Sequence, residues 1–227
     1  MLFILTGDIQ IGKTRWLSSL EGDLARAGVS CAGVIAPGVW VPSEHGDANG
    51  YEKLGIDNLL LPEGKRIAFA RRRDLALVEG TLDPQSQSAR MQLGWEISDA
   101  AIAQVNAHFD RIAQQAARTS GTAPARDAEP ACRPASAPET ASAQAGGLLI
   151  VDEFGRLELM RDMGLTSALA LVDAGPTPAF PHALVVVRET LLDLARKRFS
   201  PAWENVRPIG PTPEAHTAVF AAFGLEG

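Results

Sequence analysis

The most constraining feature of this 227-residue sequence is a glycine-rich turn between an apolar run and an amphipathic helical pattern. Residues 7–14 read Gly-Asp-Ile-Gln-Ile-Gly-Lys-Thr and match the Walker A pattern G-x-x-x-x-G-K-[ST] at every fixed position. The run 2–5 before them is typical of a strand buried on both faces of a parallel sheet. Backbone N–H groups and the dipole of the following helix converge at such a turn, which therefore predicts a phosphate-binding loop.

The side chains of this loop have separate expected roles. Lys13 is expected to reach the β- and γ-phosphates of a nucleotide, and Thr14 to place its hydroxyl on Mg²⁺. The residues expected to contact the nucleotide are Gly7, Asp8, Ile9, Gln10, Ile11, Gly12, Lys13, Thr14 and Arg15. The alternative interpretation is an ordinary strand-to-helix turn with an exposed lysine.

A second apolar run, at residues 148–151, ends in two neighbouring carboxylates, as the Walker B strand of a nucleotide site requires. Asp152 is expected to bind Mg²⁺, directly or through water. Side chains alternate in direction along a strand, so Glu153 faces differently and is expected to polarise the attacking water as general base. Glu158 is a further carboxylate expected near the metal or the water. A strand end with solvated carboxylates is the alternative interpretation.

Strands and helices alternate along most of the chain, which predicts an α/β fold with a mostly parallel sheet. Residues 37–73 are rich in turn signals and predict an antiparallel insertion, with Trp40 on a loop. The further expected strands cover residues 31–35, 51–56, 59–61, 67–70 and 183–187. The expected helices cover residues 13–27, 102–116, 157–172, 190–198 and 213–223.

Residues 118–147 differ from the rest of the chain in composition. They are rich in Ala, Pro, Ser and Thr and contain no Leu, Ile, Val, Phe, Trp or Tyr. Such a segment cannot bury enough apolar surface to offset its ordering entropy, so a disordered insertion is expected. The remaining residues, roughly 197, suit one domain. We therefore expect residues 1–227 to form a single domain interrupted by this insertion.

Composition argues against several classes of protein. The net charge of −6 argues against a dominant surface for nucleic acid. The opening apolar run is too short for a membrane span or signal peptide, so no membrane partner is expected. Cys31 and Cys132 show no metal-ligand or disulfide spacing, which suits a reducing cytoplasm. The expected partner is a nucleoside triphosphate, bound by a monomer or weak oligomer.

Residues 152–159, Asp-Glu-Phe-Gly-Arg-Leu-Glu-Leu, resemble the D-E-[apolar]-G-[basic]-[apolar]-E-L signature of P-loop nucleoside-triphosphatases also called cancer-related nucleoside-triphosphatases. The order of the other parts agrees, so the resemblance covers most of the chain outside residues 118–147. It implies a three-layer, RecA-like P-loop NTPase fold with helices on both faces of the sheet and an antiparallel hairpin extension. It also implies Mg²⁺-dependent hydrolysis of ATP, GTP and other nucleoside triphosphates with loose base selectivity.

Three segments depart from the family pattern, one of which is the insertion at residues 118–147. The family loop usually reads G-x-P-G-x-G-K-T-T, whereas this chain has Asp-Ile-Gln at residues 8–10 and Arg15 after Thr14. Asp8 adds a negative charge beside the expected phosphates, which predicts weaker binding. Residues 38–41, Gly-Val-Trp-Val, replace the basic and acidic residues that usually follow the second strand.

An arginine that stabilises the transition state would complete a hydrolytic site. The RecA-like order places the strand before Arg188 between the strands that lead to Lys13 and Asp152, so Arg188 is the expected catalytic arginine. The clusters at residues 71–73 and 196–198 are further candidates. A solvated charged face is the alternative interpretation of each.

Two other functions stay open. A nucleoside or nucleotide kinase would hold its donor in the same loop and close arginines over an acceptor, although no distinctive acceptor motif occurs. A non-catalytic nucleotide-dependent switch would bind without turnover. The chain has no N-K-x-D and no L-S-G-G-Q, which argues against a small GTPase and an ABC-type ATPase.

Overall fold

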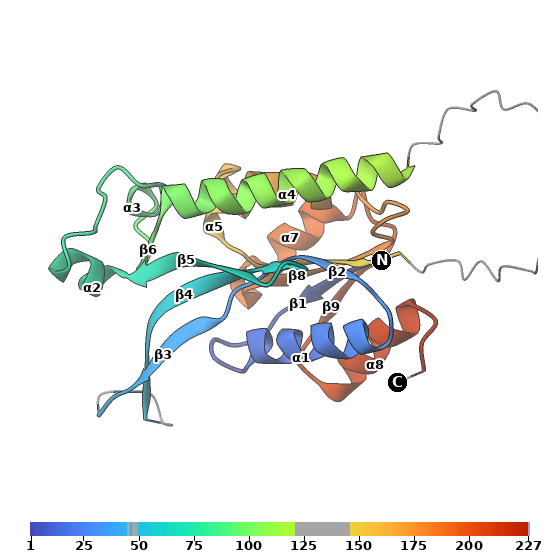
Figure 1. Ribbon diagram of the computed structural model, residues 1–227, viewed down its shortest axis with the longest axis horizontal. Helices are drawn as coiled ribbons and strands as arrows, with labels where there is room; N and C mark the ends of the chain where they lie inside the picture. Colours follow the sequence, from blue (N-terminus) through green and yellow to red (C-terminus); the bar gives the residue numbers. More distant parts are fainter. Residues whose placement is uncertain (45, 47–49, 121–145, 227) are drawn as a thin grey trace, which may run out of the picture.

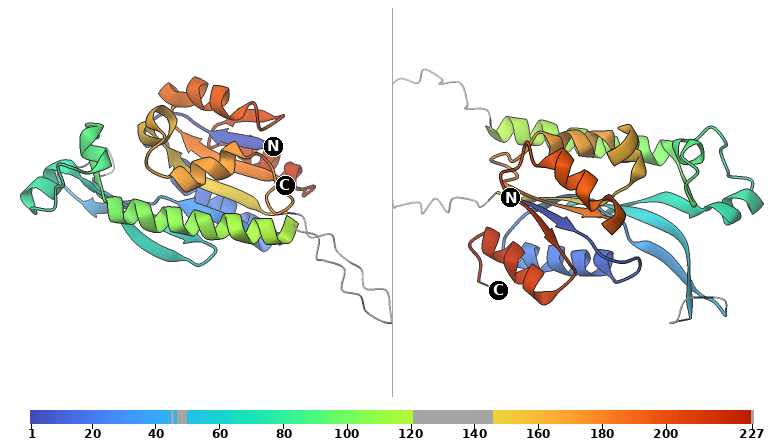
Figure 2. Two further views of the ribbon diagram at one scale, coloured as in Figure 1. Left: turned by 90° about the horizontal axis from the view of Figure 1, so that it is seen from above. Right: turned by 180° about the vertical axis from the view of Figure 1, so that it is seen from behind.

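The protein folds into three layers, with one sheet between two groups of helices (Figures 1 and 2). The computed structural model describes residues 1–44, 46, 50–120 and 146–226. One face of the sheet is covered by α1 (Lys13–Arg26) and α8 (Pro213–Ala222). The other face is covered by α4 (Asp99–Ser120), α5 (Arg156–Arg161), α6 (Thr166–Asp173) and α7 (Leu192–Phe199).

The sheet has a parallel core and an antiparallel extension, and within the described ranges it contains nine strands. The parallel core runs in the order β2 (Cys31–Ile35), β7 (Leu148–Phe154), β8 (His182–Val187), β1 (Leu2–Leu5) and β9 (Val206–Ile209). The antiparallel extension beyond β2 consists of β4 (Tyr51–Leu61), β5 (Lys65–Arg72) and β6 (Trp95–Ile97), with β3 (Gly38–Pro42) paired to β4. The expected fold class is confirmed, including the RecA-like order and the hairpin extension.

The buried strand β1 shows why a continuous apolar run marks the centre of such a sheet. Its four side chains are fully buried, and they alternate between the two hydrophobic cores. Leu2 and Ile4 face the core under α4, whereas Phe3 and Leu5 face the core under α1. Both faces are covered by helices, so neither set of side chains meets water.

The structure corrects the expected elements at three places. Residues 51–61 form one strand instead of two, because a bulge between Ile56 and Asp57 lets β4 continue pairing with β5. The expected loop at residues 38–41 is strand β3. The expected helix 157–172 is two helices, α5 and α6, separated where Asp162 and Gly164 adopt positive φ.

The expected insertion at residues 118–147 lies mostly outside the described residues. Helix α4 continues to Ser120, so residues 118–120, the first three of the expected insertion, are helical. Residues 121–145 are not described. The single-domain organisation stays a prediction. No helix within the described part of the chain is long and apolar enough to span a membrane.

Gly33 is a point where the parallel core tolerates no side chain. Its φ is +122°, and a Cβ there would lie 1.9 Å from the backbone oxygen of Ile150 on the neighbouring β7. We expect Gly33→Ala to lower the free energy of unfolding by about 3 kcal/mol or more, since strain and a backbone clash combine. The measurement is urea unfolding followed by circular dichroism.

Gly22→Ala is the matched control for that experiment. Gly22 lies within α1, and an added Cβ meets nothing within 4 Å. This substitution is expected to raise the free energy of unfolding by about 0.5–1 kcal/mol, because alanine has the higher helix propensity. Equal effects of the two substitutions would contradict the role assigned to Gly33.

Candidate functional site

The phosphate loop, residues 7–14, joins the end of β1 to the first turn of α1. Gly7, Gln10 and Gly12 have φ values of 130°, 65° and 95°, so the backbone curls through left-handed conformations. Gly12 immediately precedes α1, and no described side chain caps the start of that helix. The N–H groups of the first turn are therefore available to an anion, and the positive end of the helix dipole adds to the attraction.

Lys13 lies folded over the loop that it is expected to serve. Its Nζ donates hydrogen bonds to the carbonyl oxygens of Gly7 at 2.8 Å and Asp8 at 2.7 Å. Both acceptors are weaker partners for an ammonium than a phosphate, because charge-assisted hydrogen bonds to anions are the stronger ones. The flexible stem lets the ammonium exchange these carbonyls for phosphate oxygens without movement of the loop backbone.

Asp152 meets Thr14 where β7 ends beside the first turn of α1. The Asp152 side chain is buried, and its Oδ2 accepts a hydrogen bond from the N–H of Ala36 at 2.9 Å. It also accepts one from the Thr14 side chain. Burial raises the pKa of Asp152 to about 6, although these two hydrogen bonds oppose the shift. The two residues expected to bind the metal are thus in direct contact.

The chemistry of this pair fits Mg²⁺. A hydroxyl and a carboxylate supply hard oxygen ligands, and Mg²⁺ normally takes only one or two ligands from the protein, with phosphates and waters supplying the rest. Within the described residues, no group of three or more His, Cys, Asp or Glu is placed to hold a metal by itself. A cation at Thr14 and Asp152 would therefore be shared with the nucleotide.

Glu153 lies in a bulge of β7 and is paired with Arg188. The pairing of β7 with β8 shifts register between Val151 and Phe154, and Glu153 adopts a φ of 83° in this bulge. The Nε and Nη2 atoms of Arg188, which follows β8, both lie 2.8 Å from Glu153 Oε1. A non-glycine residue in this conformation is strained, and such strain is common at functional sites. Two more expected residues are thus brought together beside Asp152.

Glu158 has a structural role that the sequence did not reveal. Its side chain is buried, with Oε2 accepting from the N–H of Gly155 at 2.8 Å and Oε1 from that of Leu165 at 3.0 Å. Burial raises the pKa of Glu158, and the backbone hydrogen bonds act against this. Each oxygen accepts one backbone N–H, and the side chain borders the same cavity as Asp152 and Glu153, so the expectation that Glu158 lies near the metal or the water stays a prediction. It ties the start of α5 to the chain before α6.

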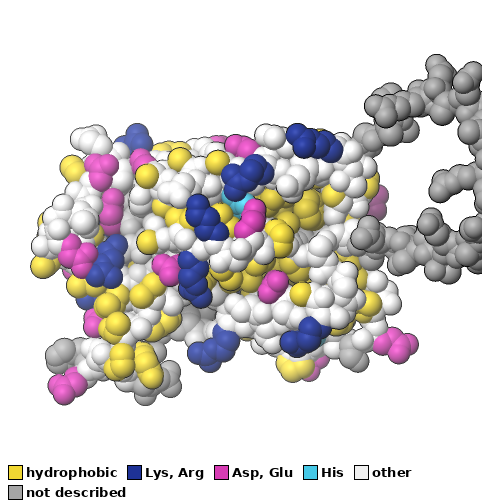
Figure 3. All heavy atoms as spheres, viewed as in Figure 1, with side chains coloured by type: hydrophobic (Ala, Val, Ile, Leu, Met, Phe, Trp, Pro, Cys, Tyr) yellow, Lys and Arg dark blue, Asp and Glu magenta, His cyan; other side chains and the backbone are white. Residues whose placement is uncertain are grey.

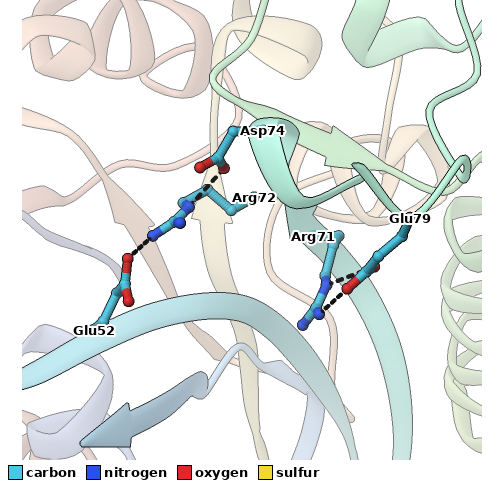
Figure 4. Close-up of polar contacts among 5 residues, drawn as sticks. All are labelled: Glu52, Arg71, Arg72, Asp74 and Glu79. Carbon is cyan, nitrogen blue, oxygen red and sulfur yellow. Dashed lines mark hydrogen bonds and ion pairs between the residues drawn. The ribbon is translucent and has the colours of Figure 1, made fainter. Parts of the chain in front are cut away.

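Two arginines of the basic cluster at residues 71–73 are engaged in local ion pairs (Figure 4), and the third, Arg73, donates to the carbonyl oxygen of Leu93. Arg71 pairs with Glu79, and Arg72 pairs with Glu52 and Asp74. These side chains hold β5 to β4 and to α2 (Arg73–Val78), at the outer end of the antiparallel extension.

Arg198, in the cluster at residues 196–198, is likewise paired with carboxylates. It contacts Asp173 at 2.7 Å and Asp162 at 2.7 Å, and so links α7 to the ends of α6 and α5. Of the arginine candidates, Arg188 is the one whose described partner is an expected catalytic residue.

Lys53 is a residue that the sequence interpretation missed. It lies on β4 opposite Trp40 of β3, with Nζ 5.9 Å from the Trp40 ring centroid and 5.3 Å from that of Trp95. Burial lowers the pKa of Lys53, whereas the charges of Glu153 and Asp152 raise it, so the ammonium lies within electrostatic reach of both carboxylates. Trp40 is on a strand beside this lysine, not on a loop. The register of β3 on β4, which the sequence does not determine, is what places Lys53 opposite Trp40.

Comparison with known proteins shows the fold. The sequence matches no family model and no curated protein sequence. The structure is similar to the solution structure of a human cancer-related nucleoside triphosphatase, with 17% identity, a TM-score of 0.51, and coverage of 98% of this chain and 94% of that one. It is also similar to the crystal structure of THEP1 from the hyperthermophile Aquifex aeolicus, with 14% identity, a TM-score of 0.52, and coverage of 98% and 96%. The resemblance drawn from the sequence is confirmed for the fold, which is that of P-loop nucleoside-triphosphatases.

Gln10 occupies a left-handed position where the family pattern has glycine. Its φ of 65° costs a residue with a Cβ about 1 kcal/mol, and the side chain is exposed. We expect Gln10→Gly to raise the free energy of unfolding by about 1 kcal/mol, as measured by urea unfolding. Gln114→Gly, at an exposed position within α4, is expected to lower it by a similar amount. A loss of stability in both variants would contradict the strain at Gln10.

Proposed function

We propose that this protein hydrolyses nucleoside 5′-triphosphates to diphosphate and phosphate with Mg²⁺. The observation that carries the proposal is the proximity of Thr14 in the phosphate loop to the buried Asp152 carboxylate near the end of β7, on whose pKa the Thr14 side chain acts. Glu153 and Arg188 lie beside these two residues. A phosphate cradle, a metal pair, a base and an arginine thus meet at the carboxyl edge of the parallel strands, where ligands bind in open α/β sheets.

Binding is assigned to the phosphate loop and the first turn of α1. The N–H groups of residues 7–14 would surround the phosphates, and Lys13 would leave its two carbonyl partners for the β- and γ-phosphate oxygens. Thr14 and Asp152 would hold the metal. A bound Mg²⁺ would supply positive charge that neutralises the phosphate oxygens as the terminal bond breaks.

Water activation is assigned to Glu153, with Arg188 as its partner. In the hydrolytic step the water oxygen bonds to the γ-phosphorus, the bond to the β–γ bridging oxygen breaks, and Glu153 takes the water proton. Arg188 holds the Glu153 carboxylate in place and lies where its guanidinium would face the equatorial oxygens of the transferring phosphoryl group. Such an arginine contributes about 10³ to 10⁵ in rate.

The finer features of the proposal come from the sequence. The substrates are ATP, GTP and other nucleoside triphosphates, because the resemblance at residues 152–159 implies loose base selectivity. We also propose a monomer or weak oligomer, located in the cytoplasm, with no membrane or nucleic-acid partner. Basic and acidic side chains are interspersed over the face shown in Figure 3, which supports the last point for that face.

Glu153→Gln separates binding from chemistry. We expect the rate of phosphate release with Mg²⁺ to fall about 10²- to 10⁴-fold, because a carboxamide cannot accept the water proton. Nucleotide affinity is expected to change little, since Glu153 does not belong to the phosphate loop. The measurements are phosphate release from ATP, GTP, CTP and UTP, and equilibrium binding of a fluorescent ATP analogue.

Lys13→Ala and Glu189→Gln complete the set of variants. Lys13→Ala removes a charged partner of the phosphates and is expected to weaken nucleotide binding about 10- to 100-fold. Glu189 is an exposed carboxylate beside Arg188, and its substitution is expected to leave both measurements unchanged. Metal-dependent phosphate release that persists unchanged in Glu153→Gln would exclude the proposed base. Transfer of the γ-phosphate to an added nucleoside in preference to water would replace hydrolysis by kinase activity.

Lys53→Met tests the lysine that the sequence interpretation missed. Its ammonium lies within electrostatic reach of Glu153 and Asp152, so its removal is expected to lower kcat/KM for ATP about tenfold. Lys53→Arg is expected to keep most of the activity, because the positive charge is retained. Lys65→Met, at an exposed position on β5, is the control. Equal activity of Lys53→Met and Lys65→Met would show that Lys53 has no part in the reaction.

A further inference from the structure

A cavity of about 310 Å³ opens beside the catalytic carboxylates, on the side away from the phosphate loop. Its walls come from the antiparallel extension, the first turn of α4, helix α5 and the short 3₁₀ helix η1 (Glu189–Leu191). Asp152, Glu153 and Arg188 are among the residues that line the cavity, and no residue of the phosphate loop lines it. A ligand held here would therefore be a second molecule, additional to a nucleotide in the loop.

Most of the cavity wall is apolar. The apolar residues that line it include Phe69, Trp95, Ile97, Ile102 and Leu165. Such a wall favours an apolar ligand over a charged one. The volume is within the range of ligand pockets, and an engineered apolar cavity of about 150 Å³ already holds benzene. An aromatic ring with one or two substituents would fill the space at ordinary packing contact.

Asn58 gives the cavity a specific polar group. It lies on β4, lines the cavity, and is only 1% exposed. Its Nδ2 is buried and has no hydrogen-bond partner among the described residues. An unsatisfied buried donor costs about 1–3 kcal/mol, so this amide strongly favours an occupant that presents an acceptor oxygen. An apolar wall with one unpaired donor is a typical small-molecule site.

We propose that this cavity is a second-ligand site for a mainly apolar, ring-sized molecule with a carbonyl-type oxygen that accepts from Asn58 Nδ2. A molecule held there would also border Glu153 and Arg188, which line the same cavity. If the proposed function holds, the occupant would therefore border the terminal phosphate of a nucleotide. Only this consequence rests on the proposed function. The binding itself depends on the cavity alone.

The test titrates two probes of one shape into the full-length, nucleotide-free protein. Acetophenone carries a carbonyl, and ethylbenzene is its near-isostere without one. Binding is followed by methyl NMR of the isoleucine and leucine side chains. We expect both probes to shift the methyl signals of Ile97, Ile102 and Leu165, which line the cavity.

Asn58→Leu is the decisive variant. Removal of the donor is expected to weaken acetophenone binding about tenfold, because one hydrogen bond to a buried donor is lost. Ethylbenzene makes no such bond, so its dissociation constant is expected to change less than twofold. Equal changes for the two probes would overturn the proposal, as would the absence of shifts at the cavity methyls, which would leave the cavity to solvent alone.

Ala70→Phe provides a second variant that does not depend on the buried amide. Ala70 is half-buried and lines the cavity, so a phenyl ring there would occupy its space. Both probes are expected to lose binding, while the thermal unfolding temperature is retained. Undiminished binding of the probes to Ala70→Phe would place them elsewhere and reject the site. Because no nucleotide is present, failure of this proposal is distinguishable from failure of the proposed hydrolysis.

Discussion

The pairing of β8 with both β1 and β7 is the constraint on which the site depends. Adjacent strands lie about 4.8 Å apart, so one intervening strand separates β1 from β7 by roughly 10 Å. The phosphate loop and the Asp152 carboxylate would not meet across that gap by themselves. The first turn of α1 spans it and brings Thr14 to Asp152. Arg188, which follows the intervening strand, then pairs with Glu153 between the two motifs. Strand order, more than any single loop, assembles the groups expected to surround the terminal phosphate.

Four of the five parallel strands were accessible from sequence because their signals are local, whereas the edge strand β9 was not among the expected strands. A buried strand, a glycine-rich turn and an amphipathic helix follow one another within 27 residues, and each has its own pattern. The position of Arg188 needed one further step, the RecA-like strand order, which the resemblance at residues 152–159 supplied and the structure confirms. The sequence motif predicted less about the surroundings of Glu158, because it does not show whether an acidic side chain faces a metal or a backbone N–H. The hydrogen bonds from Gly155 and Leu165 to Glu158 become visible only in the structure.

The antiparallel extension was harder to predict because its pairing is not local. Whether residues 51–61 form one strand or two depends on a bulge, and a bulge is decided by the partner strand β5. The register of β3 on β4 sets Lys53 opposite Trp40, and a shift of one residue would turn the lysine to the other face. Sequence alone offers turn signals here but no hydrophobic alternation strong enough to fix that register. Lys53 and Asn58, the two residues of the proposals that the sequence did not indicate, both lie on β4 for this reason.

The two parts of the sheet therefore contribute different chemistry to one edge. The parallel core supplies the phosphate loop, the two residues expected to hold a metal, and the pair formed by Glu153 and Arg188. The extension supplies a lysine held against two tryptophan rings and the donor of a largely apolar cavity. Any molecule in that cavity would share Glu153 and Arg188 with the nucleotide site, so the two ligands could not bind without influencing each other's surroundings. β4 is joined to the core through β2, and Ala36, the residue after β2, donates its N–H to Asp152, so movement of the extension would reach the pair expected to hold a metal.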